Sequence, residues 1–506
     1  MAHSFSVSPA VTALQNGKPA LIWRKQVADT ETPVSAALKL MEAERGDFLL
    51  ESVEGGETRG RHSLIGLAPD LVFRADNDQA QINAQWLHDR EAFVPQTDQS
   101  LSALRALVKR CQMDVPDGLP SALACLVGYF GYETIGLVEK LPRAPQSQLD
   151  LPDMLFVRPT VIVIFDRLAD EMFLVAPVWP ETDGDIDYKI ATAEERLDEV
   201  ERQVAAPVPS SAELPAHGDP DDLVYQPQIP AVQYEDMVLR AKNYIEAGDI
   251  FQVVLAQRFT AKFTLPPVEL YRALRRINPS PFLFFLDLPE FALIGSSPEI
   301  LVRARDGQVT IRPIAGTRPR GANAAEDITN RDSLLADPKE RAEHLMLLDL
   351  GRNDVGRVSA ANSIEVTDSY TVEFYSHVMH IVSNVVGELA PDKDALDALF
   401  AGFPAGTVSG APKVRACEII AELEPETRGA YAGGVGYFSP DGSMDSCIVL
   451  RTGIVKDGML HVQAGAGIVA DSDPAYEQRE CEAKSGALLA AAKEAVKLAQ
   501  DIGFGQ

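Results

Sequence analysis

The chain has 506 residues, of which 46% are hydrophobic and 24% are charged. This composition is typical of a folded globular protein with room for two or more domains, and it excludes a disordered or fibrous chain. The 46 Lys and Arg against 74 Asp and Glu give a formal charge of −28, which repels nucleic acid and anionic membranes, so we expect neither as a partner.

The cysteines and the first residues indicate a reducing compartment. The five cysteines lie far apart and form no Cys-x-x-Cys pair, so we expect neither a disulfide framework nor a zinc site. The first residues lack the apolar stretch of a signal peptide, and no run approaches the ~18 apolar residues that a membrane span needs. We therefore expect a cytoplasmic protein.

Helical periodicity and turn signals predict a mixed fold. The predicted helices are residues 33–44, 190–204, 232–247, 338–350 and 475–499. Asp-Gly pairs, which are typical of tight hairpins, predict antiparallel strands around residues 306–307, 441–442 and 457–458. Because helices and strands do not alternate regularly, the pattern favours an α+β fold over a doubly wound one.

A proline-rich segment, residues 204–230, divides the chain. It contains six prolines among Ser, Ala, Gly and Asp and shows little periodicity, which is typical of a linker. We predict an N-terminal α+β region over residues 1–203 and a second mixed region over residues 231–506.

Two of the predicted helices open on an Asp-Pro step, at residues 337–338 and 473–474, and each carries two glutamates three residues apart. The glutamates are Glu340, Glu343, Glu477 and Glu480. Side chains at this spacing share one helix face, and four carboxylates suit a hard cation such as Mg²⁺. The alternative is that they only complement the helix dipole or close a capping box.

Two further segments are candidates for binding an anion. The small residues at 463–467 follow a predicted strand and can offer backbone N–H groups to a carboxylate. Arg451 is expected at the end of a strand over residues 447–451, on the same face as Cys447, with a solvated surface position as the alternative. Residues 406–413 combine glycines, hydroxyls and a lysine, but they lack the order of a phosphate-binding loop.

Two histidines, His377 and His380, lie three residues apart in an apolar stretch. Each is either a general acid or base or a buried core histidine, and the spacing alone favours the core position.

Several short segments, in order along nearly the whole chain, carry a resemblance to a known family. They are residues 49–52 (LLES), 61–66 (RHSLIG), 248–255 (GDIFQVVL), 278–281 (NPSP), 312–321 (RPIAGTRPRG), 340–354, 406–413 and 473–484. These segments resemble the chorismate-utilising enzymes, and most closely the anthranilate synthase component I group of that family. The resemblance implies an α+β architecture in which antiparallel sheets pack as a sandwich with helices on the outside.

The resemblance also implies a metal and a substrate site. It places Mg²⁺ between Glu343 and Glu480, with Glu340 and Glu477 reaching the ion through water. The implied chorismate contacts are Gly316, Thr317, Tyr431, Arg451, Gly465, Ala466, Gly467 and Lys484. Chorismate carries two carboxylates, so Arg451 and the glycine backbone can bind one while Mg²⁺ binds the other.

In the family's reaction ammonia adds at C2 of chorismate, the C4 hydroxyl leaves, and pyruvate is eliminated to give anthranilate, the first step of tryptophan biosynthesis. His380 matches the family's catalytic histidine, and Thr407 is expected to position the substrate. Gln252 completes the candidate catalytic set; it stands where isochorismate and salicylate synthases have a lysine base, a role that glutamine cannot take. Ala315 replaces the nucleophilic lysine of aminodeoxychorismate synthases, so that alternative activity is disfavoured.

The resemblance implies a partner that supplies ammonia. None of the five cysteines stands in the Gly-x-Cys-x-Gly context of the family's glutaminases, so we expect a separate glutamine amidotransferase subunit, component II, in a heteromer. A non-catalytic amino-acid sensor is the alternative from another class, and the complete glutamate set argues against it.

The family binds tryptophan, its feedback inhibitor, through a Leu-Leu-Glu-Ser segment and a Pro-Tyr-Met stretch. Ser52 matches the first of these fully. Pro281, Phe282 and Leu283 stand at the second, so aromatic and aliphatic bulk is kept while a hydroxyl and a thioether are lost. The alternative is that residues 49–52 are only the edge of a core strand.

Overall fold

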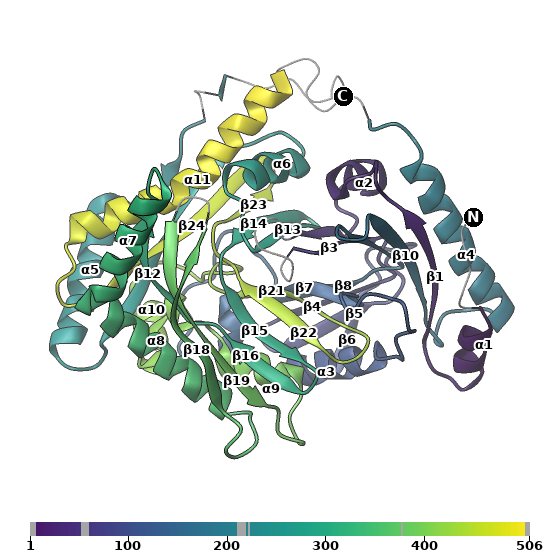
Figure 1. Ribbon diagram of the computed structural model, residues 1–506, viewed down its shortest axis with the longest axis horizontal. Coiled ribbons are helices and arrows are strands. Elements are labelled where there is room, and N and C mark those ends of the chain that lie inside the picture. Colours follow the sequence, from purple (N-terminus) through teal and green to yellow (C-terminus); the bar gives the residue numbers. More distant parts are fainter. Residues whose placement is uncertain (1–6, 52–59, 210–218, 221–222, 376–377, 501–506) are drawn as a thin grey trace.

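The computed structural model describes residues 7–51, 60–209, 219–220, 223–375 and 378–500. Its strands form two large sheets of twelve strands each, and all pairings are antiparallel (Figure 1). The first sheet has the order β1 (Ala20–Val27), β10 (Glu171–Val178), β9 (Val161–Asp166), β3 (His62–Leu67), β2 (Asp47–Glu51), β13 (Phe282–Leu288), β14 (Phe291–Ser297), β23 (Thr452–Lys456), β24 (Met459–Ile468), β12 (Gln252–Lys262) and β11 (Gln226–Pro227), with β20 (Gly410–Ala411) beside β12.

The second sheet lies against the first. Its order is β17 (Ile314–Pro319), β19 (Val378–Glu388), β16 (Gln308–Ile311), β15 (Ile300–Arg305), β22 (Met444–Ile448), β21 (Gly434–Phe438), β7 (Leu126–Phe130), β8 (Met154–Arg158), β4 (Leu71–Asp76), β5 (Gln79–Asn83) and β6 (Val94–Gln99), with β18 (Glu365–Phe374) beside β19. Both sheets take strands from either side of residues 204–230. The domain boundaries stay a prediction.

Helices cover the outside of the sheets. They are α1 (Val7–Gln15), α2 (Pro33–Leu40), α3 (Ser100–Arg110), η1 (Tyr132–Leu137), α4 (Ile186–Val204), α5 (Ala231–Glu246), α6 (Pro267–Ile277), α7 (Ala324–Ala336), α8 (Pro338–Gly356), α9 (Ala395–Gly402), η4 (Gly406–Val408), α10 (Lys413–Leu423) and α11 (Pro474–Gln500). The five predicted helices correspond to α2, α4, α5, α8 and α11. The α-helices that the sequence did not predict have 8 to 13 residues each.

Local chemistry explains the hairpins and the two Asp-Pro helix starts. The three Asp-Gly pairs join β15 to β16, β21 to β22 and β23 to β24, as predicted. Asp457 and Gly458 have φ of 51° and 73°, the left-handed backbone of the turn that matches strand twist. Asp337 caps α8 by accepting hydrogen bonds from the amides of Lys339 and Glu340.

The main core lies between the two sheets. Phe48 and Phe284 from the first sheet and Phe73 and Phe156 from the second are fully buried in one continuous cluster. A second cluster lies between the other face of the first sheet and helices α1, α2, α4, α6 and α11. The structure therefore confirms the α+β sandwich with helices outside, and none of the helices in the described ranges is both long and apolar enough to cross a membrane.

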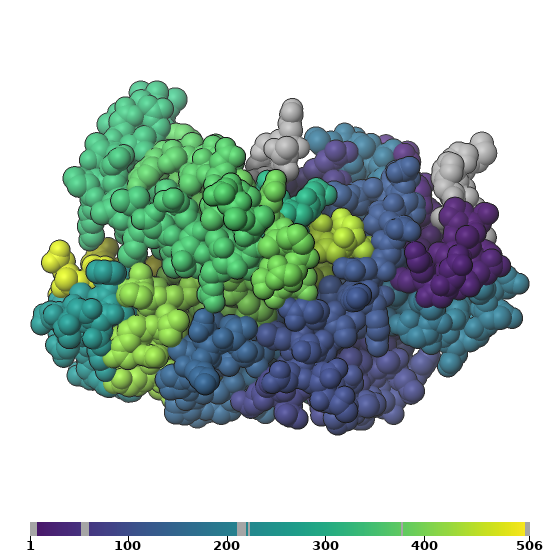
Figure 2. Space-filling view, turned by 90° about the horizontal axis from the view of Figure 1, so that it is seen from below, coloured from purple at the N-terminus to yellow at the C-terminus, as the bar shows by residue number. Residues whose placement is uncertain are grey.

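One side of the molecule has a small hydrophobic cluster that is distinct from the main core. Leu334 of α7 packs with Met379 and Ile381 of β19 in a small cluster of their own. In the space-filling view the green part of the chain rises at upper left above blue residues, and the purple N-terminal residues lie at the opposite end (Figure 2). Strand β17, α8 and β19 thus form the wall that faces β12 and β24.

Candidate active site

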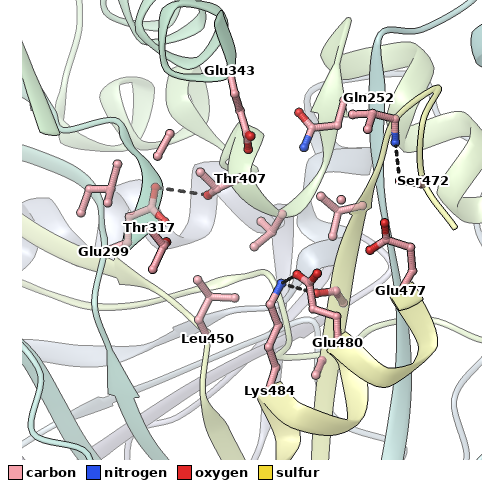
Figure 3. Close-up of a pocket in the computed structure, with 18 of the residues that line it drawn as sticks. Gln252, Glu299, Thr317, Glu343, Thr407, Leu450, Ser472, Glu477, Glu480 and Lys484 are labelled. Carbon is pink, nitrogen blue, oxygen red and sulfur yellow. Dashed lines mark hydrogen bonds and ion pairs between the residues drawn. The ribbon is translucent and has the colours of Figure 1, made fainter. Parts of the chain in front are cut away.

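A cavity of about 790 Å³, the first cavity, opens between the two sheets. Strands β12 and β24 form one wall and β17 and β19 the opposite wall, while α8 and α11 carry acidic residues to it (Figure 3). The predicted site residues that line it are Gln252, Gly316, Thr317, Glu343, His380, Thr407, Tyr431, Arg451, Gly465, Gly467, Glu477, Glu480 and Lys484.

Two predicted site residues do not line the first cavity. Ala466 alternates with the two glycines along β24 and is fully buried in the main core. Glu340 turns to Arg318, whose Nη1 lies 2.9 Å from its carboxylate, because the guanidinium spans Asp337 and Glu340. Ala466 could therefore contact a substrate only through its backbone, and Glu340 could reach a metal ion only through water.

Carboxylates from the two Asp-Pro helices meet across the first cavity. In Figure 3 Glu343 points into it from α8, and Glu480 lies on α11 next to Glu477 and Lys484. The Lys484 Nζ atom is 2.7 Å from the Glu480 carboxylate. Burial and the negative charges of Glu340 and Glu480 raise the pKa of Glu343. A cation bound between these carboxylates would relieve their repulsion.

The donor set fits Mg²⁺ held with water. Within the ranges that the structure describes, no three His, Cys, Asp or Glu side chains cluster closely enough to form a cage from protein alone. Mg²⁺ differs from zinc and calcium in this respect, because it is commonly held by one or two carboxylates and keeps several waters. Glu343 and Glu480 are the residues that would hold it, and this assignment stays a prediction.

Arg451 and Lys484 are two of the basic side chains that line the first cavity, together with Lys339 and Arg479. The predicted strand to Arg451 was too long: β22 ends at Ile448, and Arg451 lies in the connection to β23 with φ of 49°. This bend separates it from Cys447, which lines a different cavity. Lys484 Nζ donates to the carbonyl of Gly465 at 2.9 Å.

Glu299 is a further candidate site residue, which the sequence did not single out. It is buried in the first cavity, and its carboxylate accepts a hydrogen bond from Thr407 Oγ1 at 3.2 Å. Burial raises the pKa of Glu299 to about 8, although Thr407 and Arg451 favour the ionised form. At neutral pH this residue is therefore a protonated acid inside the cavity, and the only sequence signal was its place in a Ser-Ser-Pro-Glu segment.

His380 faces the first cavity from β19 with a defined tautomer. Its Nδ1 lies 3.0 Å from the carbonyl oxygen of Gly316 and 3.1 Å from Thr317 Oγ1. Because a carbonyl can only accept, Nδ1 carries the proton and Nε2 is the basic nitrogen. Burial lowers the pKa of His380, so the ring is neutral at neutral pH and can accept a proton.

The glycines of β24 allow close approach of two side chains. A Cβ on Gly465 would come within 2.8 Å of the Tyr431 hydroxyl, and one on Gly467 within 2.6 Å of Gln252 Nε2. Any larger residue would displace these groups from the wall of the first cavity.

A second cavity, of about 240 Å³, lies beside the predicted inhibitor segments. Leu283 pairs with Glu51 in the antiparallel register of β13 and β2, and Pro281 and Phe282 also line this cavity. Ser52 lies outside the described residues. Pro298 and Ile314 line both cavities, so the two share a wall.

Comparison with known proteins identifies chains similar to this one over nearly its whole length. The chain is 48% identical over 489 residues to anthranilate synthase component 1 of Cereibacter sphaeroides, covering 97% of both chains. The solved anthranilate synthase component I of Streptococcus pneumoniae superposes with a TM-score of 0.75 at 34% identity, over 92% of this chain and 99% of that one. The menaquinone-specific isochorismate synthase of Escherichia coli shares the fold, with a TM-score of 0.69 at 18% identity over 96% and 100%.

Residues 46–490 match the chorismate binding enzyme family. This range includes every strand of the two sheets except β1, and all residues that line the first cavity. The chain belongs to the chorismate binding enzyme family.

Proposed function

We propose that this chain is the chorismate-converting component of an anthranilate synthase, which forms anthranilate and pyruvate from chorismate and ammonia in tryptophan biosynthesis. The observation that carries the proposal is the first cavity itself, where Arg451 and Lys484 lie with Glu343 and Glu480. A cation site and basic side chains in one space suit a substrate with two carboxylates. The names of the relatives support the same reaction.

In the amination half, ammonia attacks C2, both ring double bonds shift, and the bond from C4 to its hydroxyl breaks. The nitrogen loses one proton, and the hydroxyl takes up one and leaves as water. Hydroxide is a poor leaving group, so a proton donor is needed at that oxygen. Glu299 is protonated at neutral pH, and Thr407 holds its carboxyl in place. Bound Mg²⁺ supplies charge neutralisation at a substrate carboxylate.

In the elimination half, the proton on C2 is removed and the bond from C3 to the enolpyruvyl oxygen breaks. The ring becomes aromatic, and the departing enolpyruvate takes up a proton to become pyruvate. His380 offers Nε2 as the base, because Nδ1 is fixed as a donor to Gly316.

Two side chains in the first cavity favour this chemistry over that of the relatives. Gln252 cannot activate water as a base, which disfavours isochorismate formation. Ala315 contributes only a methyl group, so no covalent intermediate on this residue is available. Ammonia would come from a glutamine amidotransferase subunit, which the term component 1 in the relatives' names supports.

The second cavity is the proposed tryptophan site. Glu51 at its edge is already bound by Arg275 and Tyr271, at 2.7 and 2.6 Å, so it holds the wall and does not serve the ligand. Asp445 differs: Arg303 binds its Oδ2, and its buried Oδ1 has no hydrogen-bond partner among the described residues. An amino group of the inhibitor fits that acceptor. The shared residues Pro298 and Ile314 then connect its binding to the segments carrying Glu299 and Gly316.

The direct test is incubation of the purified chain with chorismate, Mg²⁺ and a high concentration of ammonium salt. We expect anthranilate fluorescence and an equal amount of pyruvate. Formation of aminodeoxychorismate or isochorismate in place of anthranilate would overturn the proposal.

Glu343→Gln and Glu480→Gln are each expected to weaken Mg²⁺ binding by at least about 10-fold, because a charged oxygen ligand is lost while the shape is kept. Calorimetric titration with Mg²⁺ and the Mg²⁺ dependence of turnover both measure this. Glu482→Gln, on the exposed face of the same helix, is the control and should bind normally. Normal Mg²⁺ affinity in either of the first two variants would contradict the assignment.

Wild-type kcat should fall as the pH rises through about 8, because Glu299 then loses the proton that it donates. Glu299→Gln should lower kcat by about 100-fold or more and remove this step from the profile. The control is Asp287→Asn, since burial raises the pKa of Asp287 to about 7 outside both cavities. A Glu299→Gln enzyme that kept the alkaline step would show that another group causes it.

His380→Ala should slow elimination more than amination, so that an aminated, non-aromatic intermediate accumulates. Chromatographic analysis of the products over time measures both halves. His461→Ala removes a neutral histidine of β24 that lies outside the first cavity, and it should form anthranilate without accumulation. Equal slowing of both halves by His380→Ala would leave this residue only a binding or packing role.

Tryptophan should inhibit the enzyme, and Asp445→Asn should weaken inhibition by about 10-fold while changing uninhibited kcat less than twofold, because a charged acceptor becomes a neutral amide. Ser52→Phe should relieve inhibition as well, from the sequence match. Asp441→Asn, in the turn of the same hairpin, is the control. Calorimetry that detected no tryptophan binding to the wild-type chain would overturn this site.

A further inference from the structure

Arg428 lies behind the wall of the first cavity, between α10 and β21, and its side chain is only 1% exposed. Its Nη1 donates to the carbonyl of Val408 at 2.7 Å, and its Nη2 donates to the carbonyl of Val254, also at 2.7 Å. Nε and Nη2 bind the two oxygens of Glu424 at 2.9 and 2.5 Å. The guanidinium thus makes four hydrogen bonds within the protein interior.

The two carbonyls that Arg428 binds belong to residues of the first cavity. Val408 follows Thr407, and Val254 lies two residues beyond Gln252 on β12. The amide of Val254 also donates to the carbonyl of Ser409 at 2.8 Å. Arg428 therefore joins the turn that carries Thr407 to the strand that carries Gln252.

The same guanidinium touches a third part of the cavity wall. Its central carbon lies 5.5 Å from the ring centre of Tyr431, which lines the first cavity, and 4.6 Å from that of Tyr132. Glu424 extends the connection, because its Oε1 accepts from the amide of Ala256 on β12 at 2.8 Å. Three wall segments that come from distant parts of the sequence are held by one planar group.

A buried ion pair alone is a poor source of net stability, since the desolvation of both charges offsets most of their attraction. What this pair provides is geometry: a planar fork with five donors fixes two backbone carbonyls and a carboxylate at once. We propose that Arg428, with Glu424 as its counter-charge, is a positioning residue that sets Thr407, Gln252 and Tyr431 in the arrangement the reaction requires. The inference rests on the proposed function for its kinetic readout.

The test compares Arg428→Lys with Arg258→Lys. Lysine keeps the charge beside Glu424 but cannot reach both carbonyls. Arg258 is the matched control: it is a buried arginine of β12, the strand that carries Val254, and it pairs with Glu426 and Ser147 outside the first cavity. We expect the two variants to lose similar thermal stability, whereas only Arg428→Lys loses about 100-fold in kcat, with KM for chorismate changed less than threefold.

A second variant and a rescue keep the test decisive if Arg428→Lys folds poorly. Glu424→Gln keeps the acceptor for Ala256 but removes the counter-charge, so it should lower kcat by about 10-fold with KM unchanged. Arg428 also lines a third cavity, of about 270 Å³, so added guanidinium at millimolar concentration should partly restore kcat of Arg428→Ala. Guanidinium should not restore Arg258→Ala.

The outcomes separate the two claims. A wild-type chain that forms no anthranilate from chorismate and ammonium overturns the proposed function. The positioning role is overturned if the wild type is active but kcat of Arg428→Lys and of Glu424→Gln is no lower than that of Arg258→Lys. A rise in KM of these two variants without loss of kcat also overturns the positioning role, since that pattern indicates weakened substrate binding alone.

Discussion

The antiparallel pairing of β12 with β24 is the interaction on which the rest of the site depends. Its register runs unbroken from Val253 opposite Ile468 to Lys262 opposite Met459. The pair brings Gln252 next to the glycines of β24 and leads directly into α11, which carries Glu480 and Lys484. Lys484 returns to β24 through the carbonyl of Gly465, so the helix and the strand fix each other. Without this pairing the acidic residues of α11 would have no fixed position relative to those of α8.

The first cavity holds basic side chains within a strongly acidic protein. A formal charge of −28 disfavours an anionic substrate at long range, so recognition depends on groups inside the first cavity. There Arg451 and Lys484 provide positive charge, and burial keeps Glu299 protonated and His380 neutral. One property of the cavity, its burial, therefore provides both the acid and the base of the proposed mechanism.

The shared wall of the two cavities gives the proposed regulation a physical basis. Pro298 precedes Glu299, and Ile314 begins β17, where Gly316 accepts the hydrogen bond from His380. A ligand in the second cavity thus contacts the neighbours of both the proposed acid and the proposed base. Inhibition requires only that it favours an arrangement in which one of them is displaced.

Local sequence determined those features whose cause is local. The Asp-Gly hairpins, the Asp-Pro starts of α8 and α11 and the glutamates that face the first cavity follow from turn and capping chemistry and from helical spacing. The tertiary structure alone decided what depends on burial and on distant neighbours. Glu299 is a lone glutamate in the sequence and becomes an acid only because the fold buries it, and the bend at Arg451 is invisible to strand alternation. Arg428 and Glu424 lie four residues apart, the spacing of an ordinary exposed helix pair. Only the packing of β12 and of the segment at Thr407 around them buries the pair and gives Arg428 two backbone carbonyls to bind.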